Sequence, residues 1–102
     1  MSEDLTQATL GWVNEVRKSL GRPALRSMPR GRYGAQHSPV AVALDGYVGI
    51  KRVSIVDRNG NATVREMPDF VLKFNRAFDK GQIPELERPG APLKMRNAKQ
   101  KR

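Results

Sequence analysis

One segment organises this chain, residues 51–67, KRVSIVDRNGNATVREM, in which two runs rich in β-branched residues flank an Asn-Gly pair. Asn59-Gly60 is typical of a two-residue type I′ turn, because both positions tolerate the positive φ angles that this turn requires. With these two residues as the loop, the segment predicts a β-hairpin with a defined register. The expected pairs are Arg58 with Asn61, Val56 with Thr63, Ile55 with Val64, and Val53 with Glu66.

The alternation of side chains along a strand then gives the hairpin two different faces. The apolar face is expected to carry Val53, Ile55, Ala62 and Val64. The polar face is expected to carry Arg52, Ser54, Val56, Arg58, Thr63 and Arg65. Glu66 is a misfit on the apolar side, which places it at a fraying end of the ribbon. A two-stranded ribbon is marginally stable in water, so we expect a helix to cover its apolar face.

The residues that follow, Pro68 to Lys80, predict that helix. Its apolar stripe at helical spacing consists of Phe70, Val71, Phe74, Ala77 and Phe78. Pro68 suits the first turn, and Gly81 and Pro84 suit the end of the helix. All three phenylalanines of the chain lie on this helix. Because of their spacing we expect them in the core and not on an exposed stacking platform.

The rest of the chain predicts two further helices and an extension of the sheet. A helix from Ser2 would bury a stripe of Leu5, Ala8, Trp12, Val13, Val16 and Leu20, and would end at Gly21. Ser38-Pro39 predicts the start of a short buried helix. Residues 47–50 are expected to add strand residues before the hairpin.

The predicted fold class is therefore α+β. The expected order is an N-terminal helix, a long basic loop, a short helix, a β-hairpin, a helix and a disordered basic C-terminal tail. Residues 1–86 are expected to form a single small domain. Residues 87–102 are expected to be a flexible basic tail, because they carry little apolar surface.

Composition argues against several classes of function. The chain has 102 residues, no cysteine, one histidine and a net charge of +9. Without cysteine, disulfides and thiol catalysis are excluded, and a structural zinc site is not expected. No catalytic spacing surrounds His37, and phosphate-loop and dinucleotide signatures are absent. We therefore expect no catalytic residue, no metal and no cofactor, and a protein that is not an enzyme. No apolar run approaches the ~20 residues of a membrane span, and the acidic N-terminus does not read as a signal peptide.

The basic residues suggest anionic partners. No acidic residue occurs between Glu15 and Asp45, and this interval contains the sequence Arg30-Gly-Arg-Tyr33. Arginine contacts phosphate in a fork, tyrosine stacks on bases, and glycine allows a close backbone approach. The alternative is a solvated loop whose Leu25 and Met28 pack on the core. The predicted nucleic-acid-binding residues are Arg22, Arg26, Arg30, Arg32, Arg52, Arg58, Arg65, Lys94, Arg96, Lys99, Lys101 and Arg102.

Three segments carry a family resemblance, namely residues 11–17 (GWVNEVR), 38–44 (SPVAVAL) and 78–86 (FDKGQIPEL). Together they resemble short, mostly uncharacterised proteins encoded by phages of actinobacteria. The resemblance covers residues 5 to 86 and brings no established activity, so no functional residue is carried over. It implies a cytoplasmic phase in a bacterial host.

The leading hypothesis is a small non-enzymatic, phage-encoded binding protein that engages nucleic acid through arginine-rich surfaces. One alternative is a module that binds and modulates a bacterial host protein, with growth inhibition as one outcome, and the partner would then be an acidic host protein. Another is a minor virion component. The oligomeric state is left open by the sequence.

Overall fold

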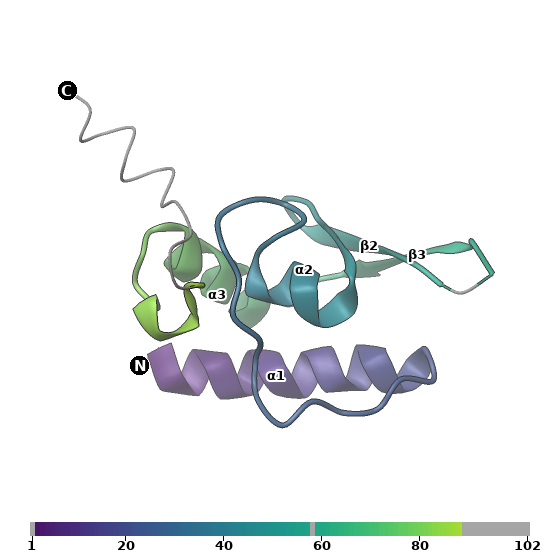
Figure 1. The fold of residues 1–102 in the computed structure, drawn as a ribbon, viewed down its shortest axis with the longest axis horizontal. Coiled ribbons are helices and arrows are strands. Elements are labelled where there is room, and N and C mark those ends of the chain that lie inside the picture. Colours follow the sequence, from purple (N-terminus) through teal and green to yellow (C-terminus); the bar gives the residue numbers. More distant parts are fainter. Residues whose placement is uncertain (1, 58, 89–102) are drawn as a thin grey trace.

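The structure is a computed structural model that describes residues 2–57 and 59–88. The chain forms helix α1 (Ser2–Ser19), helix α2 (Pro39–Leu44), strands β1 (Gly46–Val48), β2 (Arg52–Val56) and β3 (Ala62–Glu66), helix α3 (Asp69–Asp79) and a 3-10 turn η1 (Pro84–Leu86). The strands form an antiparallel sheet in the order β1-β2-β3. The predicted α+β class is therefore confirmed. Figure 1 shows α1 along one side of the molecule, with α2, α3 and the sheet all on the same side of this helix.

The core lies where α1, α2 and α3 meet the inner face of the sheet. Its fully buried large side chains include Val13 of α1, Leu44 of α2, Ile55 of β2 and Phe74 of α3. Trp12 packs half-buried against this cluster. Burial of these apolar side chains is the main stabilising contribution in a domain of this size.

Helix α2 begins where Ser38-Pro39 predicted it. The Ser38 side chain accepts a hydrogen bond from the backbone N–H of Ala41, at 3.4 Å, and Pro39 is the first helical residue. Asp45 ends the helix in the left-handed conformation, with φ 54°. This turn directs the chain into β1, which pairs with β2 and extends the predicted hairpin to three strands. Of the residues 47–50 that were predicted to be extended, Tyr47 and Val48 lie in β1, whereas Gly49 and Ile50 lie in the turn that follows.

The predicted turn and register of the hairpin are wrong by one residue. Val53 pairs with Arg65 and Ile55 with Thr63, where the two-residue turn predicted Glu66 and Val64. The loop is longer because Asp57 closes it: its carboxylate accepts hydrogen bonds from the N–H groups of Asn59 and Asn61, each at 2.9 Å. Gly60 then takes a left-handed conformation, with φ 83°, as in a three-residue hairpin loop.

A shift of one residue moves every side chain of β3 to the opposite face. Val64 was predicted to be buried but is 54% exposed, and Ala62 is exposed with it. Thr63 and Arg65 instead lie on the inner face, opposite Ile55 and Val53. Glu66, predicted as a misfit on the apolar face, lies on the outer face.

Helix α3 buries Val71, Phe74 and Phe78. The expectation that all three phenylalanines are in the core is wrong for Phe70, which is 36% exposed. The buried stripe is centred between Val71 and Phe74, so that Phe70 falls at its edge.

The long loop between α1 and α2 is attached to the C-terminal end of the described chain. Gly31 forms a parallel bridge with Glu87. Its N–H donates to the carbonyl of Leu86, and its carbonyl accepts from the N–H of Arg88, both at 2.8 Å. Met28 is buried in the core, at 4% exposure. The flexible tail was predicted to begin at residue 87, but Glu87 and Arg88 are paired with Gly31. The rest of that prediction, residues 89–102, lies outside the described residues.

Candidate nucleic-acid interface

Three of the predicted nucleic-acid-binding arginines are engaged by the fold itself. Arg22 donates to the carbonyl of Leu44 at 2.9 Å. Arg65 donates to the Ser19 hydroxyl at 2.9 Å. Arg52 lies 3.7 Å from the carboxylate of Glu66 on the outer face of the sheet, where both side chains are well exposed. Arg52 lies on the outer face of the sheet, whereas Arg65 lies on the inner face opposite Val53. The sequence-based prediction that these two arginines share one face is therefore wrong.

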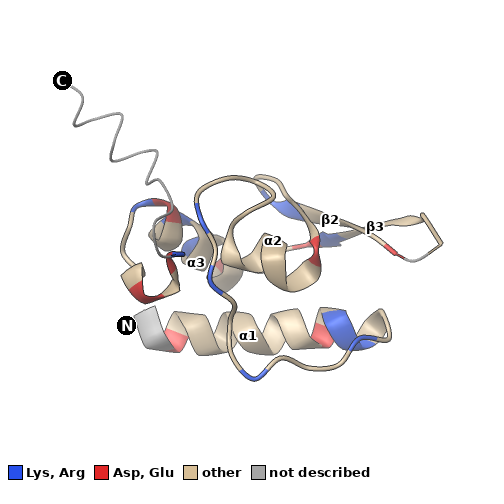
Figure 2. Cartoon of the chain, viewed as in Figure 1, with Lys and Arg blue, Asp and Glu red and all other residues tan. Residues whose placement is uncertain are grey.

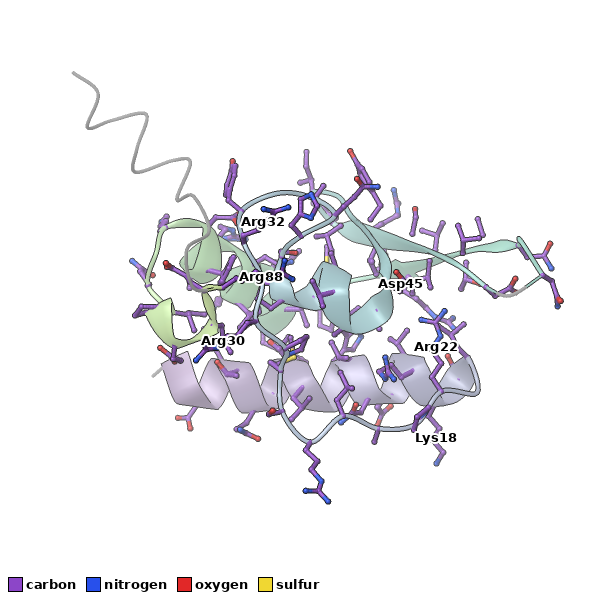
Figure 3. All side chains as sticks on the ribbon, viewed as in Figure 1. Lys18, Arg22, Arg30, Arg32, Asp45 and Arg88 are labelled. Carbon is purple, nitrogen blue, oxygen red and sulfur yellow. The ribbon has the colours of Figure 1, made fainter. Side chains whose placement is uncertain are left out.

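Arg22 acts together with Arg17 at the C-terminal end of α2. Arg17 donates to the carbonyl of Ala43 at 2.7 Å and to that of Pro23 at 2.8 Å. The last carbonyls of a helix have no partner within the helix and carry its negative dipole end, so that two guanidinium groups satisfy and stabilise them. In Figure 3, Arg22 reaches toward the end of α2 near Asp45. These two basic residues therefore have a structural role.

A different group of arginines gathers at the bridge between Gly31 and Glu87. In a parallel pair, the residues next to the bridge on each strand come side by side, which places Arg32 beside Arg88. Arg30 precedes the bridge on the same loop. Arg30 and Arg88 are exposed and Arg32 is half-buried. Figure 3 shows the three side chains along the line where the loop meets the C-terminal end. We call Arg30, Arg32 and Arg88 the arginine ridge.

Gly31 in the ridge serves the chain's own backbone. A Cβ atom at this position would overlap the carbonyl oxygen of His37 and would lie 2.8 Å from the backbone nitrogen of Pro39. The glycine in Arg30-Gly-Arg-Tyr33 was predicted to let a ligand approach the backbone. Its observed role is to let the loop pack against the start of α2.

A groove of about 520 Å³ lies beside the ridge, between α3 and the residues around β1. One wall carries Leu72, Asn75, Arg76 and Asp79 of α3. The opposite wall includes Tyr33, which follows Arg32 directly in the chain, and Tyr47 of β1. Burial raises the pKa of the Asp79 carboxyl above its ordinary value. We call this the tyrosine groove. The sequence singled out Tyr33, but it gave no signal for Tyr47 or for the residues of α3.

The outer face of the sheet is apolar at its centre. Tyr47, Ser54 and Val64 form one row across the three strands. Tyr47 is 55%, Val56 57% and Val64 54% exposed, and Ile50 in the turn after β1 is 91% exposed. The sequence missed this surface because the predicted register turned Val64 inward.

The remaining predicted basic residues are either isolated or outside the described residues. Arg26 is exposed on the loop. Figure 2 shows both basic and acidic positions on α1, α3 and the sheet, so that the basic positions do not form one continuous surface there. The predicted binding residues outside the described residues are Arg58, Lys94, Arg96, Lys99, Lys101 and Arg102.

The described residues contain no group of three or more His, Cys, Asp or Glu side chains placed to hold a metal ion. His37, the one histidine of the sequence, is exposed. Across the same residues, no helix combines the length and the apolar character needed to cross a membrane.

Comparison with known proteins gives no relative: no family model, no curated protein and no solved structure matches this chain. The resemblance to phage proteins receives no support from these comparisons, and it stays a prediction.

Proposed function

We propose that this protein binds nucleic acid, with the arginine ridge and the basic residues that follow it as the principal contacts to phosphate. The observation that supports this most is the bridge between Gly31 and Glu87. It places Arg32 beside Arg88, although the two segments are far apart in sequence, and Arg30 precedes the bridge on the same loop. Neighbouring arginine side chains suit the phosphates of a nucleic-acid backbone.

The distribution of charge supports the same surface. The described residues hold thirteen of the nineteen Lys and Arg residues and all ten Asp and Glu residues, which leaves them with a charge of +3. The other six basic residues have no acidic residue among them, and five of these six follow Arg88 in the sequence. The excess charge is therefore concentrated after the ridge, and it favours binding through the release of counterions from nucleic acid.

A salt titration tests the proposal. Affinity for fluorescein-labelled single-stranded and duplex oligonucleotides would be measured by anisotropy over a range of KCl concentrations. We expect affinity to fall steeply with salt. A triple variant with Arg30→Ala, Arg32→Ala and Arg88→Ala should lower the slope of log K against log salt by about 2 on a single strand, since each phosphate contact contributes about 0.7.

The matched control removes three other positive charges, all exposed, by Lys51→Ala, Lys73→Ala and Lys80→Ala. It changes the net charge of the protein by the same amount. A difference in affinity between the two triple variants therefore reports where the positive charges lie and not how many there are. A flat affinity across the salt range would refute nucleic-acid binding. An equal loss in both triple variants would refute the ridge as the contact surface.

The outer face of the sheet favours a second candidate function, the binding of another protein. Exposed apolar groups such as Ile50, Val56 and Val64 suit an apolar partner surface, and the nearby Lys51 and Arg52 suit one with acidic residues beside it. In this reading the partner is a bacterial host protein, as the phage resemblance implies. A partner that survives nuclease treatment and is lost on Val64→Glu would favour this function, and one lost on nuclease treatment would count against it. Detection of the chain in purified particles would favour the virion alternative.

A further inference from the structure

The tyrosine groove has the chemistry of a site for a flat, neutral aromatic ring. It combines two aromatic side chains and the aliphatic Leu72 with a few polar groups, as small-molecule sites do. Its two tyrosines come from the loop and from β1, and are partly exposed, Tyr33 at 36% and Tyr47 at 55%. Their rings are therefore accessible to a ligand, and the loop and strand β1 hold them in place.

The groove has no net positive charge that would attract a phosphate. Its α3 wall holds one cation, Arg76, and one half-buried carboxyl, Asp79, whereas the ridge holds three arginines. Burial of this carboxyl raises its pKa. A phosphate is therefore favoured at the arginine ridge, and an uncharged ring is favoured in the groove.

The two surfaces are contiguous. Arg32 of the ridge and Tyr33 of the groove are consecutive residues, so the groove begins where the ridge ends along the chain. A nucleotide likewise carries an anionic phosphate and a neutral base on one sugar.

We propose that the tyrosine groove binds one unpaired nucleobase of a strand whose phosphates lie on the arginine ridge, so that the protein prefers single-stranded nucleic acid. This inference rests on the proposed function. Tyr33 and Tyr47 supply stacking surfaces, and Arg76 supplies hydrogen-bond donors at the edge of the groove. A base within a duplex is stacked and paired, and it does not enter such a groove unless it leaves the helix.

The test compares three labelled ligands of equal length, namely a single strand, a strand with an abasic site at every position, and a duplex. All are measured with the full chain by anisotropy at one low salt concentration. We expect the single strand to bind about tenfold more tightly than the abasic strand, because one stacked base contributes roughly that factor. Tyr33→Ala should reduce this preference several-fold, and Tyr33→Phe, which keeps the ring, should retain it.

Two further variants separate the groove from the ridge. Arg32→Ala should weaken binding of the single strand and of the abasic strand by the same factor. Arg76→Gln changes an exposed side chain, so it should preserve the fold while lowering the preference for bases. Circular dichroism confirms that each variant is folded. If Tyr33→Ala is unfolded, Arg76→Gln alone decides the result.

The outcomes are distinguishable. Equal, salt-sensitive affinity for the single strand and the abasic strand would overturn the groove as a base site and leave the proposed function standing. A preference for bases that persists in folded Tyr33→Ala and in Arg76→Gln would also overturn it. The absence of salt-sensitive binding to any of the three ligands would overturn both proposals.

Discussion

Gly31→Ala should destabilise the protein strongly, although it adds a single methyl group. The added Cβ would overlap the carbonyl oxygen of His37 and would lie 2.8 Å from backbone atoms of Ser38 and Pro39. These are backbone atoms at the start of the buried helix α2, so they cannot rotate away as the end of a side chain would. The loop at Gly31 must therefore move off α2.

The size of the effect follows from the hydrogen bonds held at this position. Gly31 bonds to Leu86 and to Arg88, both at 2.8 Å, and the N–H of Arg32 donates to the carbonyl of His37 at 2.7 Å. If displacement of the loop breaks these three bonds, at about 1 kcal/mol each, the free energy of unfolding falls by about 3 kcal/mol. For a domain of this size that corresponds to a fall in Tm of about 12–24 °C.

The assay is urea unfolding followed by circular dichroism at 222 nm, with Gly11→Ala as the matched control. Gly11 lies in α1, and a Cβ there would meet nothing within 4 Å. The same substitution at Gly11 should therefore stabilise the protein by up to about 1 kcal/mol through helix propensity. A Gly31→Ala protein within about 0.5 kcal/mol of the wild type would refute the reasoning, because the backbone would then have relaxed at little cost.

Three further predictions concern side chains that the fold uses. Arg17→Ala should lower the free energy of unfolding by about 2 kcal/mol, because its hydrogen bonds to two backbone carbonyls are lost. The control Arg26→Ala, on the exposed loop, should change the free energy of unfolding by less than about 0.5 kcal/mol. Thermal unfolding measures both variants. Asp57→Ala should lower the free energy of unfolding by about 1–2 kcal/mol, because two loop N–H groups lose their acceptor. Asp57→Asn keeps one acceptor oxygen and should recover part of this loss. An equal loss of stability in both variants would count against a stabilising role for these hydrogen bonds. The raised pKa of Asp79 means that the folded state holds its proton to a higher pH than the unfolded state, so its contribution to stability is present below pH 3.8 and is lost as pH rises through the folded pKa. Asp79→Asn should therefore stabilise the protein at pH 7 and flatten that part of its pH dependence in urea unfolding, and an unchanged pH dependence would contradict the assignment.

The local signals in the sequence predicted the three α-helices and strands β2 and β3, and they came close to the ends of the helices. Ser38-Pro39 began α2, Gly81 followed α3 with a positive φ of 78°, and two runs of β-branched residues became β2 and β3. Each of these features depends on interactions within a few residues, such as a cap, a permitted φ angle or a preference for extended backbone. They could therefore be predicted without knowledge of the rest of the chain.

The register of the hairpin needed more than local propensity. Asn59-Gly60 fits two different turns, and the choice between them came from the carboxylate of Asp57, which bonds to two N–H groups of the loop. That one-residue difference turned Val64 outward and Arg65 inward. It therefore produced the apolar outer face of the sheet and removed Arg65 from the predicted polar face.

Which basic residues are available to a ligand was decided by the tertiary structure alone. The sequence made Arg22 and Arg32 equivalent members of one basic interval, but folding placed Arg22 on the carbonyl end of α2 and Arg32 beside Arg88. The tyrosine groove likewise has walls from the loop, β1 and α3. Contacts between segments this far apart depend on how the whole core packs, and no local pattern of residues encodes them.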